Sequence, residues 1–132
     1  MITDKPIHID FIAHSAQDYC TCGNYGETAK ELWFTISHMD KPVYMLAILF
    51  HELWEKLRND QMGLTDEEVT AFDLAHLDAD DPGCLPDAPY HRQHMEAMKI
   101  ERLMIRLAGE NWNEYDKAVM ALAWRDQSKG KS

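Results

Sequence analysis

Basic residues are scarce in this chain, which has 13 lysines and arginines against 23 acidic residues and a net charge of −10. Nonspecific nucleic-acid binding requires a basic face, and the sequence contains no cluster of lysine and arginine that would supply one. Long apolar segments are also lacking: the longest run, VYMLAILF, is far shorter than the roughly 20 residues of a membrane-spanning helix. We therefore expect neither a nucleic acid nor a membrane as a partner.

Cysteine is also scarce. The chain has three cysteines, an odd number that fits no disulfide framework. Cys20 and Cys22 lie two positions apart, which is not the C-x-x-C spacing of zinc ribbons, so cysteine ligation of a metal is disfavoured. The first residues, MITDKPIHIDFIAHS, lack the basic start and the apolar segment of a signal peptide. These features indicate reduced thiols and a cytoplasmic protein.

The composition that remains is that of a folded protein. Hydrophobic residues make up 45% and charged residues 27% of 132 residues, which is typical of soluble globular chains. This length suffices for one hydrophobic core, and we expect a single domain over residues 1–132.

Alternating apolar residues predict strands at about 6–14 and 31–37, which we expect to form a hairpin with a long loop. Helical periodicity and capping signals predict four helices after them. One such signal is the capping box made by Thr65 and Glu68. The expected fold class is therefore α+β, an N-terminal β-hairpin packed on a mainly helical core. The predicted helices span residues 41–60, 66–78, 89–108 and 113–127.

The first predicted helix carries the motif HELWE, residues 51–55, which differs from the zinc-protease motif H-E-x-x-H at its last position. His51 and Glu55 are four residues apart and share a helical face that is otherwise apolar. Glu52 occupies the position at which H-E-x-x-H enzymes carry their general base. A plain hydrogen-bonded pair of His51 with Glu55 remains the alternative interpretation.

The other predicted helices place further polar groups on faces that should be buried. His94 and Glu101 are two turns apart on one side of the 89–108 helix, and Asp73 lies on the inner face of the 66–78 helix. A buried carboxylate without partners costs several kcal/mol or becomes protonated. A shared cation removes that cost, and facing helices are where such sites are built.

Together these positions predict a metal site whose ligands are His51, Glu55, His94, Glu101 and Asp73. Histidine nitrogen with carboxylate oxygen suits a divalent transition metal, with zinc favoured and manganese, iron or nickel as alternatives. A buried polar network without any metal is the competing hypothesis.

The motif order resembles a family of small uncharacterised bacteriophage, prophage and bacterial proteins. Their pattern contains an H-E-[LI]-x-E helix and an A-P-Y-x-x-x-H-x-x-A-x-x-I-E-R helix, which match HELWE and APYHRQHMEAMKIER here. The chain is more distantly similar to small zincin-type metalloproteins. The resemblance implies that the five predicted ligands act as one set, in a host cytoplasm if the protein is phage-encoded, and it brings no activity with it.

Two functions are consistent with this pattern. In the first, the chain is a metal-dependent hydrolase with an unidentified substrate and Glu52 as the general base, a role for which Glu101 competes. If Asp73 and Glu101 hold a second metal, phosphoester chemistry is favoured. In the second, the chain is a non-catalytic accessory protein that binds a host protein, and the His/Glu cluster is structural.

Overall fold

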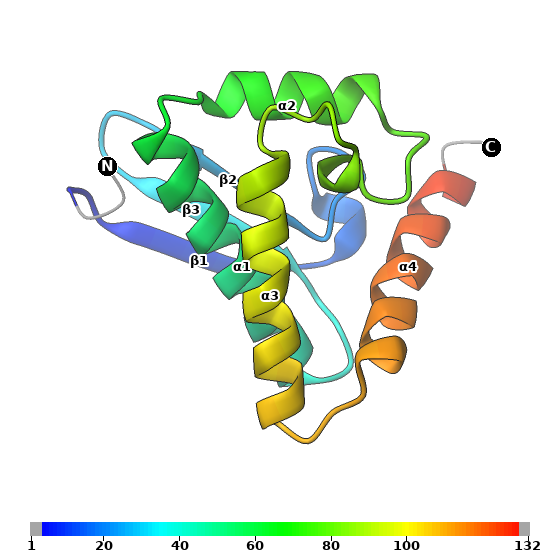
Figure 1. Cartoon of the computed structure of the whole chain (residues 1–132). Coiled ribbons are helices and arrows are strands. Elements are labelled where there is room, and N and C mark those ends of the chain that lie inside the picture. Colours follow the sequence, from blue (N-terminus) through cyan, green and yellow to red (C-terminus); the bar gives the residue numbers. More distant parts are fainter. Residues whose placement is uncertain (1–3, 130–132) are drawn as a thin grey trace.

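The computed structural model describes the backbone of residues 4–129 and the side chains of residues 4–122. Within them, three strands precede four α-helices, so the fold is α+β as predicted (Figure 1). The strands are β1 (Ile7–Ile12), β2 (Gly23–Glu27) and β3 (Leu32–Ser37). The helices are α1 (Pro42–Gln61), α2 (Asp66–Ala75), α3 (His91–Leu107) and α4 (Trp112–Lys129), with short 3-10 helices η1 (His14–Ala16) and η2 (Pro82–Cys84) in the loops. No helix among the described residues is both long and apolar enough to cross a membrane.

The pairing of the strands differs from the predicted hairpin. The two predicted strands are neighbours, but they run parallel, with Ile7 opposite Leu32. The hairpin is formed instead by β2 and β3, and the sheet order is β1-β3-β2. The sequence of β2, GNYGE, has no apolar alternation, and its Gly26 leaves room for the ring of Trp33, which would lie 2.3 Å from an added Cβ. The glycine interrupts the apolar alternation that would mark β2 as a strand in the sequence. Its lack of a side chain is also what lets the Trp33 ring pack against β2.

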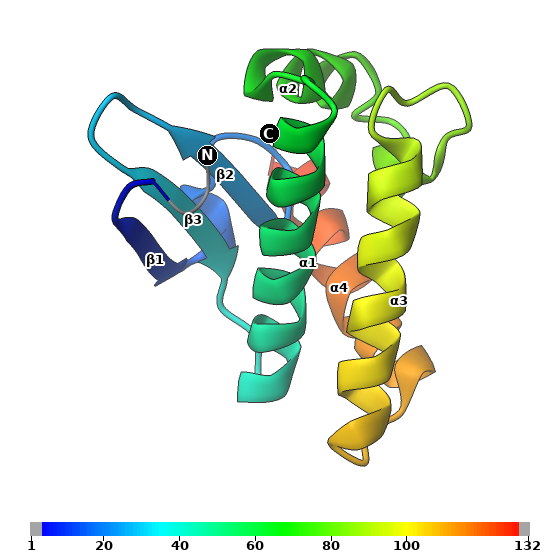
Figure 2. The same cartoon turned by 60° about the vertical axis from the view of Figure 1, so that its left-hand side comes forward.

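Helix α1 lies between the sheet and α3 (Figure 2). The alternating residues Leu32, Phe34 and Ile36 of the central strand β3 are fully buried, and they form the main core together with α1 residues such as Ala47 and Ile48. This core fixes the height and rotation of α1. His51 and Glu55 continue the same buried face of α1 one and two turns beyond Ala47, on the side where α1 meets α3.

Helix α2 begins as predicted and ends early. The Thr65 hydroxyl accepts a 3.2 Å hydrogen bond from the Glu68 amide, and the Glu68 carboxylate accepts one of 3.3 Å from the Thr65 amide. The helix ends at Ala75 rather than at residue 78. Just after Ala75 the His76 ring contacts the Phe72 carbonyl at 2.8 Å, and the chain turns. This turn sends residues 76–90 back toward α3 as a loop.

Candidate metal centre

Two helices bring the central histidines and glutamates together. On α1, His51 and Glu55 are one turn apart, and both are buried. On α3, His94 and Glu101 are two turns apart, and both are buried as well. Since α1 and α3 pack side by side, these faces meet inside the protein (Figure 2).

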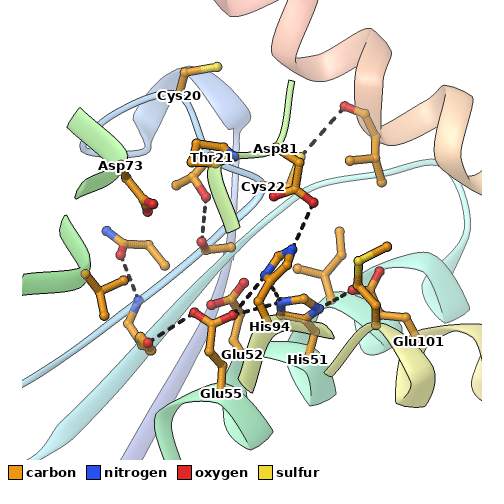
Figure 3. Close-up of a pocket in the computed structure, with 18 of the residues that line it drawn as sticks. Cys20, Thr21, Cys22, His51, Glu52, Glu55, Asp73, Asp81, His94 and Glu101 are labelled. Carbon is orange, nitrogen blue, oxygen red and sulfur yellow. Dashed lines mark hydrogen bonds and ion pairs between the residues drawn. The ribbon is translucent and has the colours of Figure 1, made fainter. Parts of the chain in front are cut away.

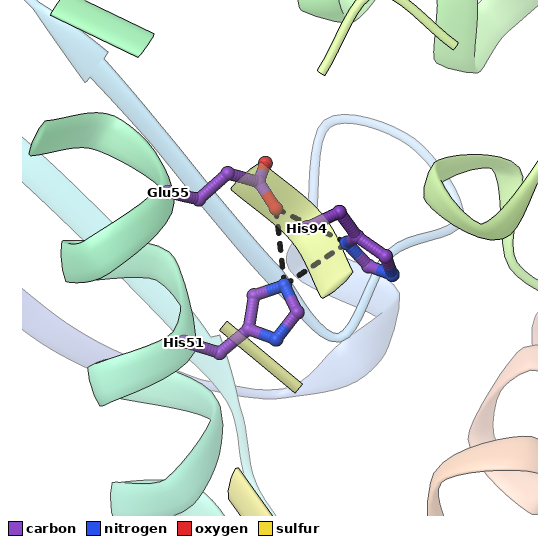
Figure 4. Close-up of side chains that lie close together, drawn as sticks. All are labelled: His51, Glu55 and His94. Atoms are coloured by element: carbon purple, nitrogen blue, oxygen red, sulfur yellow. Dashed lines mark hydrogen bonds and ion pairs between the residues drawn. The ribbon is translucent and has the colours of Figure 1, made fainter. Parts of the chain in front are cut away.

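Three of these side chains point their polar atoms at one position (Figure 4). His51 Nε2 lies 3.0 Å from Glu55 Oε2 and 3.1 Å from His94 Nδ1, and His94 Nδ1 lies 3.1 Å from Glu55 Oε2. Ligands at about 2.0–2.1 Å from a tetrahedral zinc ion are about 3.3–3.4 Å apart. The triangle formed by these atoms is therefore close to one face of such a coordination shell, and the three residues form a group that can hold a metal ion.

The outer atoms of the triangle are held by further polar groups. His51 Nδ1 contacts Glu101 Oε1, and His94 Nε2 lies 2.9 Å from Asp81 Oδ2. Metal-binding histidines usually donate their second ring N–H to a carboxylate, which fixes the ring and raises its basicity. Both histidines here have that partner.

The carboxylates are supported in the same way. Tyr25 donates a 3.2 Å hydrogen bond to Glu55 Oε1 and receives one of 2.8 Å from the side chain of Asn59. Tyr115 donates a 2.5 Å hydrogen bond to Glu101 Oε2. The cluster is thus oriented by a shell of buried partners rather than by the two helices alone.

Electrostatics within the cluster shift the pKa values of its members. Burial lowers the pKa of His51, but the carboxylates of Glu101 and Glu55 outweigh it and raise that pKa to about 10. Burial raises the pKa of Glu55, but His51 and His94 outweigh it and lower that pKa to about 2. The pKa of His94 is raised too, because Asp81, Cys84 and Glu55 outweigh burial. In the absence of a metal ion, the surrounding carboxylates therefore favour the protonated form of each histidine.

A metal ion and a plain hydrogen-bond network differ in what lies between the two rings. If both imidazoles were protonated, N–H groups of His51 and His94 would face each other across 3.1 Å, an unfavourable contact of two donors, whereas one neutral ring could accept from the other. A divalent ion that replaced two protons would leave the total charge unchanged and accept a lone pair from each ligand. The geometry of the donor set is thus compatible with a metal ion as well as with a hydrogen-bond network.

The structure places the remaining predicted site residues differently. Glu101 contacts the far nitrogen of the His51 ring, so it supports a ligand rather than completing the triangle. Asp73 is not part of the cluster: it accepts hydrogen bonds from Tyr90 and, at 2.7 Å, from Tyr19. Burial raises the pKa of the Asp73 carboxyl, although both tyrosines act in the opposite direction.

Glu52 and the three central residues line one pocket of about 200 Å³ (Figure 3). The pocket lies between the helices and the segment of residues 19–25, and Asp73 and Asp81 lie on its wall. Burial and the neighbouring Glu55 raise the pKa of the Glu52 carboxyl well above its usual range, although His51 and His94 act in the opposite direction. Glu52 therefore accepts a proton more readily than a solvent-exposed glutamate does.

Three residues of the site were not predicted from the sequence: Asp81, Tyr25 and Tyr115. Asp81 belongs to an acidic, proline-containing loop in which no periodicity singles out one residue. The loop approaches closely because Gly83 has no side chain: an added Cβ would lie 2.5 Å from the His94 ring. Tyr115 lies on α4, and its contact with Glu101 of α3 depends on how these two helices pack.

The contact of Asp81 with His94 leads to a first prediction. Asp81→Asn replaces the carboxylate by an amide that binds the ring N–H more weakly, so metal affinity should fall by about 10–100-fold with the fold intact. Isothermal titration with zinc measures this change. The matched control is Asp78→Asn, an exposed residue of the same loop that does not line the pocket, and this variant should bind zinc as the wild type does. Equal affinities of the two variants would contradict a supporting role for Asp81.

Comparisons with models of protein families, with curated proteins and with solved structures found no match. The resemblance to bacteriophage and bacterial proteins therefore stays a prediction. The function has to be argued from the site itself.

Proposed function

We propose that this protein is a metal-dependent hydrolase that binds one divalent transition-metal ion, with zinc favoured. The ligands in this proposal are His51, Glu55 and His94. The observation that carries it is the convergence of their three ligand atoms, with both histidines backed by a carboxylate. Two histidines and one glutamate form a ligand set that catalytic zinc uses while a fourth position stays open for water.

The pocket favours catalysis over a purely structural ion. A structural zinc site is closed by four protein ligands, whereas the triangle here provides three and borders a cavity. Glu101, the nearest further carboxylate on α3, is occupied by the outer nitrogen of His51 and by Tyr115. A metal ion in this position supplies Lewis-acid chemistry, polarising a substrate carbonyl and lowering the pKa of water.

In this proposal Glu52 carries the proton. It follows His51 in the chain, lines the same pocket and lies beside Glu55 and His94 in the close-up view (Figure 3). Its raised pKa suits a group that first accepts and then returns a proton. Glu52 would take the proton lost by water as the oxygen attacks a carbonyl carbon. It would then deliver that proton to the leaving amine as the C–N bond breaks.

The charges around the pocket narrow the substrate class. None of the described residues that line it is lysine or arginine. The acidic residues that line it are Glu52, Glu55, Asp66, Asp73, Asp80, Asp81, Glu101 and Asp116. Phosphoryl groups are normally bound by arginine, lysine or paired metals, and this wall would repel them. The proposal is therefore an amide or peptide substrate that is neutral or carries an amine, and phosphoester chemistry is disfavoured.

A matched set of substrates tests this assignment. We expect zinc-loaded protein to hydrolyse alanine p-nitroanilide, which has a free ammonium group. Its kcat/KM should be at least about tenfold higher than the kcat/KM for the N-succinyl derivative, which is an anion. p-Nitrophenyl phosphate should not be hydrolysed above background. The His51→Ala variant, prepared in parallel, gives the rate of any contaminating enzyme.

The outcomes separate the hypotheses. Preference for the anionic substrate would contradict the substrate class while leaving the hydrolase intact. Stoichiometric metal without hydrolysis of any substrate would contradict the hydrolase and favour the accessory protein with a structural ion, and the search would then turn to a host protein as partner. Absence of metal after reconstitution with zinc, manganese, iron and nickel would reduce the cluster to a buried polar network.

A further inference from the structure

Strand β1 presents an apolar stripe that the rest of the described chain leaves open. Ile7, Ile9 and Phe11 are 40%, 40% and 39% exposed. They lie opposite Leu32, Phe34 and Ile36, and therefore share with them the face of the sheet that packs on α1. Helix α1 covers β3 and β2 but does not reach over β1 (Figure 2).

The outer edge of β1 also offers hydrogen-bonding groups. The Pro6 carbonyl accepts a 2.9 Å bond from the Leu32 amide, and the Ile12 carbonyl accepts one of 2.7 Å from the His38 amide. Because N–H and C=O directions alternate along a strand, the even-numbered residues face β3. The N–H and C=O groups of Ile7, Ile9 and Phe11 therefore point away from the sheet, along an edge on which no further strand lies among residues 4–129.

Proteins usually protect such an edge with lysine, proline or a bulge inside the strand. The segment IHIDFI contains neither lysine nor proline, and its six residues pair with β3 one to one, without a bulge. Ile7, Ile9 and Phe11 lie on one face, and His8 and Asp10 alternate with them on the other face, which ends with Ile12. The strand thus has the pattern of one that pairs with another strand.

We propose that a second copy of this chain pairs with β1, antiparallel and about a two-fold axis at Ile9. In this register Ile9 lies opposite Ile9 of the partner subunit, Ile7 opposite the partner's Phe11, and His8 opposite the partner's Asp10. The outward N–H and C=O groups of residues 7, 9 and 11 then bond across the axis, as hydrogen-bonded pairs of an antiparallel ladder. Two three-stranded sheets become one continuous sheet.

The charges of β1 select this register among the symmetric ones. Residues whose N–H and C=O groups point outward must pair with such residues of the other subunit. The two-fold axis can therefore pass through a residue of β1 but not between two residues. An axis at Asp10 places two aspartates opposite each other, and an axis at His8 places two histidines together and pairs fewer residues. His8 Nε2 already lies 2.8 Å from Glu31 Oε2 of its own chain, which leaves the second ring nitrogen for a further partner. Only the axis at Ile9 brings that ring opposite the Asp10 carboxylate of the other subunit, an arrangement that stabilises a cross-strand pair.

This interface is independent of the metal centre. No residue of β1 lines the pocket, and β1 and α3 lie on opposite sides of α1 (Figure 2). The two apolar stripes would join on the face of the sheet that carries the α1 helices. The dimer therefore leaves the pocket of each subunit accessible.

Light scattering coupled to gel filtration tests the dimer on the full chain. We expect the wild type at about 100 µM to have twice the 15.3 kDa mass of the chain. Ile9→Lys places two ammonium groups opposite each other at the axis and should weaken dimerisation by at least about 100-fold, giving the monomer mass. Ile9→Val keeps a β-branched apolar residue and should stay dimeric. Circular dichroism and zinc content show whether the lysine variant is folded.

A disulfide test then fixes the register. In a Cys84→Ser background, an oxidised mixture of His8→Cys and Asp10→Cys proteins should yield a covalent heterodimer, because these positions face each other across the axis. Neither variant alone should form a covalent dimer, since like positions are too far apart to be bridged. A monomeric wild type, a dimer that survives Ile9→Lys with its fold intact, or covalent dimers of either variant by itself would overturn the proposal.

Discussion

His94→Ala is expected to lower the metal content of the purified protein from about one divalent ion per chain to less than about a tenth. In the proposed site the ring supplies one of three ligand atoms, and it comes from α3, so its loss would leave two ligands, His51 and Glu55, on one helix. Two ligands on a single turn hold a transition metal far more weakly than three converging ones do. His51→Ala should have the same effect.

Elemental analysis of untagged protein purified without chelator measures this loss, and His38→Ala is the matched control. His38 is an exposed histidine in the loop before α1, and none of its atoms contributes to the cluster. A metal ion whose free concentration is 100 times its dissociation constant adds about 2.7 kcal/mol to the free energy of unfolding. Chelation should therefore lower the wild-type Tm by about 5–10 °C. Chelator should not lower the Tm of His94→Ala further. Metal retained in His94→Ala would contradict the assignment of the ligands.

Glu52→Gln is expected to retain the metal and the fold and to lose hydrolytic activity by about 100–10,000-fold. Glutamine has the shape of glutamate but cannot accept a proton from water. Its effect on stability has a defined sign. The pKa of Glu52 is raised in the folded protein, so ionisation of this carboxyl opposes folding above its unfolded-state pKa. A neutral amide removes that opposition, and the Tm at pH 7 should stay the same or rise.

The measurement is kcat for the best substrate, taken with metal content and Tm on the same preparation. Glu67→Gln, an exposed residue in the first turn of α2, controls for the loss of one negative charge and should leave kcat unchanged. If Glu52→Gln unfolds the protein, Glu52 is a structural residue and the likeness to zincin-type sites fails. If the variant keeps full activity with bound metal, another group carries the proton.

The helical part of the molecule could be predicted because its signals are local. The capping box at Thr65 and Glu68, the i,i+4 spacing of His51 and Glu55 and the spacing of His94 and Glu101 are properties of single segments. An α-helix turns each spacing directly into a shared face. Sequence alone therefore determined which polar groups would lie on inward faces and that a cation was one way to stabilise them there.

Contacts between distant segments were decided only by the tertiary structure. Strand direction depends on the path of residues 13–31, and either a hairpin or a parallel pair satisfies the alternation in β1 and β3. Glu101 faces the outer nitrogen of His51, and Asp81 reaches His94 from a loop beside Gly83. Which atom of a ring meets which carboxylate depends on packing to within an ångström, and no periodicity in the sequence encodes it.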